Sequence, residues 1–187
     1  GEPEFNEVFL DNVFVPDDLV LGEVDKGWDV AMGTLAYERV AIATGRVNTR
    51  KAVDRLVEDI RTRKDSQGQP LGNDPVVRQT MADLYGRAYI HYLIGQRVAW
   101  GVASGGPPGP VASIGKLFFT PLVDGLMDFR VSLDPMGGQW DLEDENQAAG
   151  EWLKLAYQSR GSAIAGGSTF IQRNILAERI LGMPRSQ

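Results

Sequence analysis

The sequence predicts a mainly α-helical protein, an antiparallel helical bundle preceded by one or two short β-strands. Apolar residues recur at three- and four-residue spacings through most of the 187 residues, as they do on one face of an α-helix. Short segments rich in glycine and proline interrupt this spacing, as the loops of a bundle do. Only the first residues alternate apolar and polar side chains, which is the period of a β-strand.

The composition is that of one globular domain and argues against several classes of protein. Its 43% hydrophobic and 24% charged residues are ordinary values, and 187 residues suffice for one buried core. A net charge of -6 argues against a nucleic-acid-binding surface. The lack of cysteine and the single histidine, His91, argue against a metal site. Since no apolar run reaches membrane-spanning length and no signal peptide opens the chain, we expect a cytoplasmic protein without a membrane span.

Residues 5–15 are expected to form the strands. Their alternation is broken once by a turn-like Asp11-Asn12, and Pro16 ends it because proline cannot extend a hydrogen-bonded ladder. A strand pair of this size is not stable alone in water. We therefore expect the edge of a sheet whose remainder is missing or belongs to another domain.

Helical spacing follows Gly27 and runs from about residue 28 to residue 61, ahead of a polar loop at residues 63–70. The next helix is expected to start at Asn73 or Asp74, because either side chain can accept a hydrogen bond from the free amides of the first turn and Pro75 suits that turn. Its apolar face carries Val77, Met81, Leu84, Ala88, His91, Gly95, Val98 and Val102.

The second half of the chain predicts three more helices. Residues 104–110, rich in glycine and proline, precede a helix over about residues 111–133 that is expected to bend at Pro121. Residues 134–147 are predicted to be a mobile loop. Helices over about residues 148–159 and 168–181 follow, and Gly182 with Pro184 closes the last one.

The segment Gly166-Gly167-Ser168-Thr169 is the first candidate for chemistry. It opens a helix, whose first turn has free amides and a positive dipole end. Glycines also let a ligand approach the backbone, so the segment could hold an anionic or polar cofactor group. By itself the pattern favours an ordinary helix cap after a tight turn.

The chain resembles the acyl-CoA dehydrogenase family over essentially its whole length, most weakly between about residues 61 and 150. The ending resembles that of many bacterial members at residues 164–169, 171–174 and 177–185. The front resembles the family where its β-domain meets its C-terminal bundle, at residues 5–9, 13–16, 21–23, 27–28, 31–32 and 38–39. The resemblance implies that residues 1–24 end the β-domain and residues 25–187 form the C-terminal helical bundle domain.

The same resemblance implies an FAD site. In the family, FAD lies between the β-domain and the bundle, and a Gly-Thr turn near the carboxyl end contacts it. The positions of this chain that match that turn are Gly167, Ser168, Thr169 and Phe170. Many relatives carry their catalytic glutamate just before the turn, where this chain has Gly166.

A subgroup that resembles isovaleryl-CoA dehydrogenase takes its base from a Glu-Arg pair on the first long helix, which Glu38-Arg39 matches. The resemblance therefore implies Glu38 as the catalytic base and Ala36, Tyr37 and Arg39 as substrate-binding residues. The reaction needs a carboxylate near the acidic α-carbon of the thioester. Without the resemblance, Glu38 would be a surface glutamate paired with an arginine.

The implied function is FAD-dependent α,β-dehydrogenation of an acyl-CoA thioester, with an electron-transfer flavoprotein as electron acceptor and a homodimer or homotetramer as the assembly. This chain alone is expected to be inactive, because the rest of the site would lie upstream. Three alternatives stay open: a non-catalytic partner subunit of a mixed acyl-CoA dehydrogenase oligomer, a flavin monooxygenase that shares the fold, and an assembly module.

Overall fold

The computed structural model describes residues 6–44, 48–106, 109–133 and 147–185. The predicted loop at residues 134–147 therefore lies outside the described residues except for its last position. The chain divides into two compact units, Gly1–Thr34 and Leu35–Gln187. Helix α1 (Gly27–Ala43) begins in the first unit and ends in the second.

The predicted N-terminal strands are absent from the described part of the first unit. Residues 6–16 form no strand, and a short 3-10 helix, η1 (Asp17–Leu19), follows. Strand pairing requires a partner ladder, and no other strand is present in the described residues. Apolar side chains of this segment are largely exposed, including Phe9 at 84% and Phe14 at 85%. The alternating pattern was therefore wrong as a prediction of strands at residues 6–15, the part of that segment that the structure describes.

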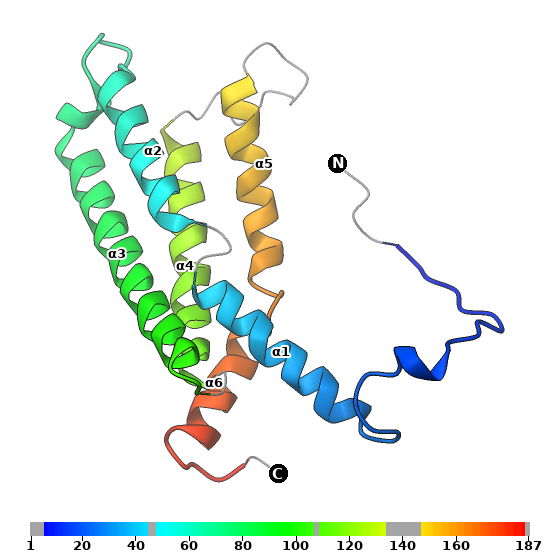
Figure 1. Cartoon of the computed structure of the whole chain (residues 1–187). Coiled ribbons are helices and arrows are strands. Elements are labelled where there is room, and N and C mark those ends of the chain that lie inside the picture. The colour runs from blue at the N-terminus through cyan, green and yellow to red at the C-terminus, as the bar shows by residue number, and fades with distance from the viewer. Residues whose placement is uncertain (1–5, 45–47, 107–108, 134–146, 186–187) are drawn as a thin grey trace. The chain divides into compact units, whose positions relative to one another are not determined.

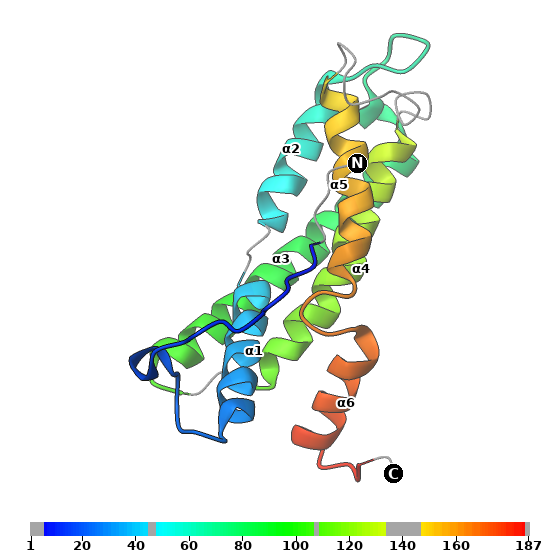
Figure 2. The ribbon, with the colours of Figure 1, turned by 90° about the vertical axis from the view of Figure 1, so that its right-hand side faces the viewer.

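The predicted helical bundle is confirmed. The region expected to be helical from residue 28 to residue 61 contains two helices, because α1 ends and α2 begins within it. Consecutive helices from α2 to α5 run in opposite directions (Figures 1 and 2). The remaining elements are α2 (Thr49–Thr62), η2 (Leu71–Asn73), α3 (Pro75–Ala103), α4 (Val111–Ser132), α5 (Gln147–Ser162) and α6 (Thr169–Arg179).

Side-chain caps start two of these helices as the sequence suggests. Asp74 accepts hydrogen bonds from the amides of Val76 and Val77 at 2.7 and 3.3 Å, which satisfies donors of the first turn of α3. Asn48 accepts from the Lys51 amide at 3.0 Å and begins α2. Helix α4 continues through Pro121, whose side chain is exposed, and a bend there stays a prediction.

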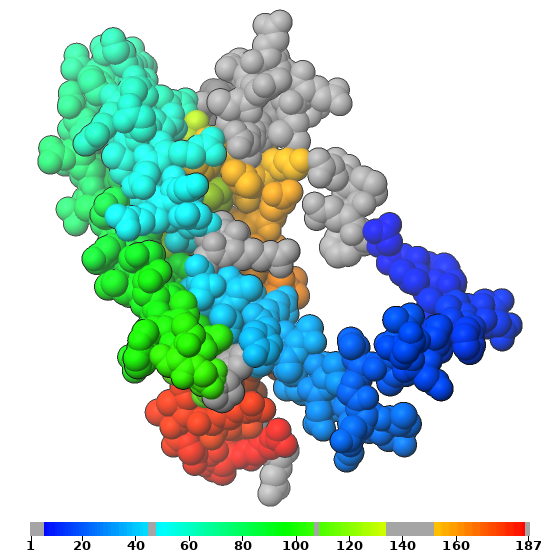
Figure 3. All heavy atoms as spheres, viewed as in Figure 1, coloured from blue at the N-terminus to red at the C-terminus, as the bar shows by residue number. Residues whose placement is uncertain are grey.

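The hydrophobic core lies among α2, α3, α4 and α5. In the space-filling view, α2 and α3 form one continuous surface in cyan and green (Figure 3). The apolar face predicted for α3 is buried from Met81 to Val98, with Val77 and Val102 half-buried at its ends. The core residues buried between these helices are Val53, Leu56, Ile60, Met81, Leu84, Ala88, Phe119, Leu122, Val123, Leu126, Met127, Trp152 and Ala156.

Two glycines let the end of α1 approach the bundle closely. Ala43 is 1% exposed and packs with Val98 and Ala112. A Cβ atom added at Gly95 would lie 2.6 Å from the Ala43 carbonyl oxygen, and one at Gly115 would lie 2.7 Å from the Ala43 Cβ. Larger residues at either position would push α1 away from α3 and α4. These contacts hold the last turns of α1 against the bundle.

His91 gives the bundle a predicted sensitivity to acid. The ring is 2% exposed, its Nδ1 lies 3.3 Å from the Thr49 hydroxyl, and burial lowers its pKa. The unfolded chain then binds more protons than the folded chain below about pH 6.5, the ordinary value for histidine. The free energy of unfolding should fall as pH drops below that value.

Denaturant titrations between pH 7 and pH 5 on the wild-type protein and a His91→Phe variant check this expectation. The variant removes the titrating group but keeps an aromatic ring beside Phe119, which lies 5.5 Å from His91 between centroids. The difference in unfolding free energy between the two proteins should change with pH. A constant difference would contradict the role of His91.

None of the helices in the described ranges has both the length and the apolar character needed to cross a membrane.

Candidate functional site

The turn between α5 and α6, residues 163–168, carries two consecutive left-handed glycines. Gly166 has a φ of +69° and Gly167 a φ of +92°, conformations that cost little only for glycine. At Gly167 an added Cβ would lie 2.5 Å from the Gln172 Nε2 atom. The Gln172 side chain, 1% exposed, donates to the Gly166 carbonyl oxygen at 2.6 Å. We call residues 163–168 the α5–α6 turn.

This turn leads into the N-terminus of α6, which has no side-chain cap. Ser168 occupies the cap position with extended backbone, and its side chain makes no capping hydrogen bond. The amides of the first turn of α6 therefore have no side-chain cap, and the Ser168 hydroxyl is not used as one. Such an end can donate hydrogen bonds to an anionic or carbonyl group of a ligand. Gly167, Ser168 and Thr169 are each half-buried.

Helix α1 brings Glu38 to the same turn. A Cβ atom added at Gly166 would overlap the Cδ1 atom of Ile42, so Ile42 packs directly over Gly166. Glu38 lies four residues before Ile42 and hence on the same face of α1. The two positions at which the family resemblance implies a base, Glu38 and Gly166, thus lie on facing segments.

Charged side chains of three helices surround this junction. Burial lowers the pKa of Lys116 in α4, while the charges of Asp124 and Glu38 raise it. Burial also lowers the pKa of Arg39, and Arg179 in α6 lowers it further, against an opposite effect of Glu38. Glu38 therefore acts electrostatically on both Lys116 and Arg39. The charged groups here are the carboxylates of Glu38 and Asp124, the buried ammonium group of Lys116, and the guanidinium groups of Arg39 and Arg179.

The remaining residues predicted for the site are less enclosed. Ala36, Glu38 and Arg39 are half-buried, whereas Tyr37 is 60% exposed. Phe170 is 76% exposed at the start of α6. Of these residues, Glu38 and Arg39 are the half-buried charged ones on α1, whereas Tyr37 and Phe170 lie on the surface. In this part of the chain no group of three or more His, Asp or Glu side chains could hold a metal ion.

Comparison with known proteins identifies the family of the chain. The family model described as "Acyl-CoA dehydrogenase, C-terminal domain" matches residues 25–181. The chain belongs to the acyl-CoA dehydrogenase family. Its α-helical bundle is the C-terminal fold of that family.

Curated members of the acyl-CoA dehydrogenase family match nearly the whole chain. It is 35% identical to acyl-CoA dehydrogenase FadE34 of Mycobacterium tuberculosis over 99% of this chain and 24% of that protein. It is 34% identical to acyl-CoA dehydrogenase IpdE1 of Mycolicibacterium smegmatis over 99% of this chain and 44% of that protein. The chain thus spans from about a quarter to less than half the length of these relatives.

Solved acyl-CoA dehydrogenase structures share the fold. The structure of a protein described as "Tcur3481-Tcur3483 steroid ACAD" matches with a TM-score of 0.77 and 25% identity, over 95% of this chain and 45% of that one. Members of the family are FAD-dependent.

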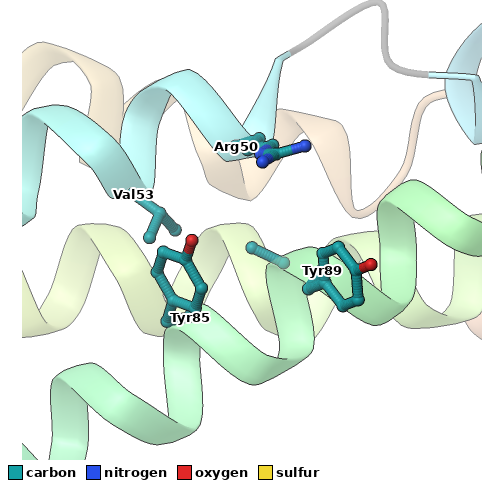
Figure 4. Close-up of a pocket in the computed structure, with 5 residues that line it drawn as sticks. Arg50, Val53, Tyr85 and Tyr89 are labelled. Carbon is teal, nitrogen blue, oxygen red and sulfur yellow. The ribbon is translucent and has the colours of Figure 1, made fainter.

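A shallow hollow lies between α2 and α3 (Figure 4). It is lined by Arg50, Val53, Tyr85, Ala88 and Tyr89, and its empty volume is about 170 Å³ including open solvent. Pockets that bind cofactors or drug-sized ligands are usually larger, about 300–1,000 Å³. None of its lining residues belongs to α1, α6 or the α5–α6 turn.

Sequence reasoning missed Lys116 and Gln172. Lys116 occupies the stripe of α4 that otherwise carries buried residues such as Ala112 and Phe119. A lysine at helical spacing within an apolar stripe indicates a buried amine that needs a partner. That signal was present in the sequence. Gln172 gave no comparable signal, because glutamine is ordinary in the first turns of a helix.

Proposed function

We propose that this chain is the catalytic C-terminal part of an FAD-dependent acyl-CoA dehydrogenase that converts an acyl-CoA thioester to its 2-enoyl form. The observation that carries the proposal is the junction of Glu38, on α1, with the glycine turn that opens α6. Family membership supports the reaction class. We also propose that residues 1–24 end the preceding β-domain and that residues 25–187 form the helical bundle domain.

The residues of the turn fit a flavin. Ser168 leaves its hydroxyl free of capping, and the left-handed conformation of Gly167 brings the backbone directly into the first turn of α6. Gly167, Ser168, Thr169 and Phe170 would hold the cofactor through backbone amides, a hydroxyl and an exposed ring. When bound, FAD supplies the acceptor for the hydride that leaves the β-carbon of the substrate.

Glu38 would act as the general base. Its carboxylate would take the proton from the α-carbon of the thioester while the hydride leaves the β-carbon, so that the two losses form the double bond. Arg39, next in sequence and half-buried, would lie near the thioester together with Ala36 and Tyr37.

We further propose a homodimer or homotetramer that passes electrons to an electron-transfer flavoprotein. Exposed apolar and aromatic side chains on α3, among them Tyr89, Leu93 and Trp100, support a surface for self-association. A non-catalytic partner subunit is the second candidate, because Gly166 supplies no carboxylate and because one matched structure, the "ChsE4-ChsE5 complex from Mycobacterium tuberculosis", combines two differently named proteins.

Acyl-CoA-dependent dye reduction by the intact protein that carries this chain tests the proposal. Stoichiometric flavin, bleaching of the flavin by acyl-CoA and a 2-enoyl-CoA product are the expected results. Light scattering of the same sample distinguishes a homo-oligomer from a subunit that needs a different partner. A flavin-loaded homo-oligomer that no acyl-CoA reduces would contradict the catalytic assignment, and oxygen-dependent hydroxylation would favour the monooxygenase.

A further inference from the structure

Lys116 is a buried lysine with a specific attachment to the α5–α6 turn. Its side chain is 2% exposed. The ammonium group donates one hydrogen bond to the Ser162 carbonyl oxygen at the end of α5 and another, of 3.1 Å, to the Thr120 hydroxyl. It also lies 5.9 Å from the centroid of the Phe119 ring, within the range of a cation–π contact.

The buried location of Lys116 lowers the stability of the fold. An ammonium group removed from water is unfavourable unless it has hydrogen-bond partners or opposite charges. Burial correspondingly lowers the Lys116 pKa, with Asp124 and Glu38 acting in the opposite direction. A methionine would fill a similar volume without that cost. Packing of α4 alone therefore does not explain a lysine here.

The contacts of Lys116 do explain why a lysine is present at this position. A Cβ atom at Gly166 would lie 4.0 Å from the Lys116 Cε atom on one side and would overlap Ile42 on the other. Gln172 holds the Gly166 carbonyl oxygen from α6. Lys116 thus holds the last residue of α5, from which the turn starts, and Gln172 holds the Gly166 carbonyl oxygen within the turn. Ile42 of α1 packs over Gly166.

We propose that Lys116 is a positioning residue that clamps the α5–α6 turn in the form that contacts flavin. This inference rests on the proposed flavin site. It assigns to α4 the task of holding the turn against the helix that carries Glu38. Because a hydrogen bond from a charged group is among the stronger ones in proteins, its loss should loosen the turn before it affects the core.

The experiment compares hydrogen exchange, flavin affinity and thermal stability of the intact wild-type protein with those of a Lys116→Met variant. Hydrogen exchange of the flavin-free protein reports on the amides of Ala163, Ile164 and Ala165, which donate to carbonyl oxygens of Arg160 and Gly161 at 3.0–3.2 Å. We expect these amides to exchange about tenfold or more faster in the variant. Flavin titration should then show affinity weakened by about tenfold or more, with unchanged or higher thermal stability.

Two control variants isolate the clamp. Arg130→Met also removes a buried cation from α4, but Arg130 pairs with Asp59 of α2 at 2.6 Å, fourteen residues along the helix from Lys116. It should lower stability and leave exchange in the turn unchanged. Thr120→Val removes the second acceptor of Lys116, together with the hydrogen bond of 3.4 Å from the Thr120 hydroxyl to the Lys116 carbonyl oxygen. It should leave exchange in the turn and flavin affinity near wild type. Should Lys116→Met fail to fold, Lys116→Arg, which keeps a donor and the charge, should retain slow exchange in the turn.

Unchanged exchange at residues 163–165 in folded Lys116→Met, or fast exchange in Lys116→Arg, would overturn the clamp. A loosened turn with unchanged flavin affinity would overturn its connection with the cofactor. If the wild-type protein binds no flavin at all, the proposed function has failed, and the exchange measurement still decides whether Lys116 holds the turn.

Discussion

Replacing Glu38 by glutamine in the intact protein should slow reduction of the flavin by saturating acyl-CoA by about 10²–10⁴-fold, the usual contribution of a positioned general base. Glutamine keeps the size and hydrogen-bonding capacity of the side chain but cannot accept the α-proton. Flavin content and acyl-CoA binding should therefore persist. Stopped-flow absorbance of the flavin measures the rate directly, and Glu38→Asp should keep part of it because a shorter carboxylate is misplaced but still basic.

Glu58→Gln is the matched control for this substitution. Glu58 is an exposed glutamate on α2, outside the junction of α1 with the α5–α6 turn, and its replacement should leave the rate at the wild-type value. If the Glu38→Gln protein reduces its flavin as fast as the wild type, Glu38 is not the base. The non-catalytic subunit and the flavin monooxygenase would then become the better assignments.

The helices could be predicted because their signals are local. The apolar stripe of α3 and the cap formed by Asp74 ahead of Pro75 depend only on residues near one another in sequence, and the structure has both. The strands expected at residues 5–15 depend instead on a partner ladder. Alternating apolar and polar residues indicate that one face of a strand can be buried, but they do not supply the partner strand that the hydrogen bonds require.

The site could be predicted only in part for a related reason. Family resemblance indicated Glu38 and the Gly167-Ser168 pair, but no local pattern predicted how α1 packs against the turn. That packing places Ile42 over Gly166, and Gly95 and Gly115 let Ala43 approach α3 and α4. These contacts join residues that are distant in sequence. Glycine, alanine and isoleucine are common in helices, so the sequence gives no signal for such contacts.

A second large effect on the rate of flavin reduction is expected when a glutamate is placed at residue 166, where many relatives carry their catalytic glutamate. Adding Gly166→Glu to the Glu38→Gln protein should by itself leave flavin reduction within about tenfold of the Glu38→Gln rate. A glutamate at a φ of +69° costs about 1–2 kcal/mol, and its Cβ would overlap Ile42. The turn would shift, and the new carboxylate would be misplaced.

Removing the obstacle should change that result. With Ile42→Ala added, the Cβ at residue 166 gains room, and we expect flavin reduction at least tenfold faster than in the Glu38→Gln protein, about 1.4 kcal/mol of barrier. The control is Ile42→Ala with Glu38→Gln and the native Gly166, which has space but no carboxylate. Stopped-flow rates normalised to flavin content separate the effects. If the triple variant is no faster than this control, a carboxylate at residue 166 does not reach the α-carbon. The overlap with Ile42 would then not be what keeps the base on α1.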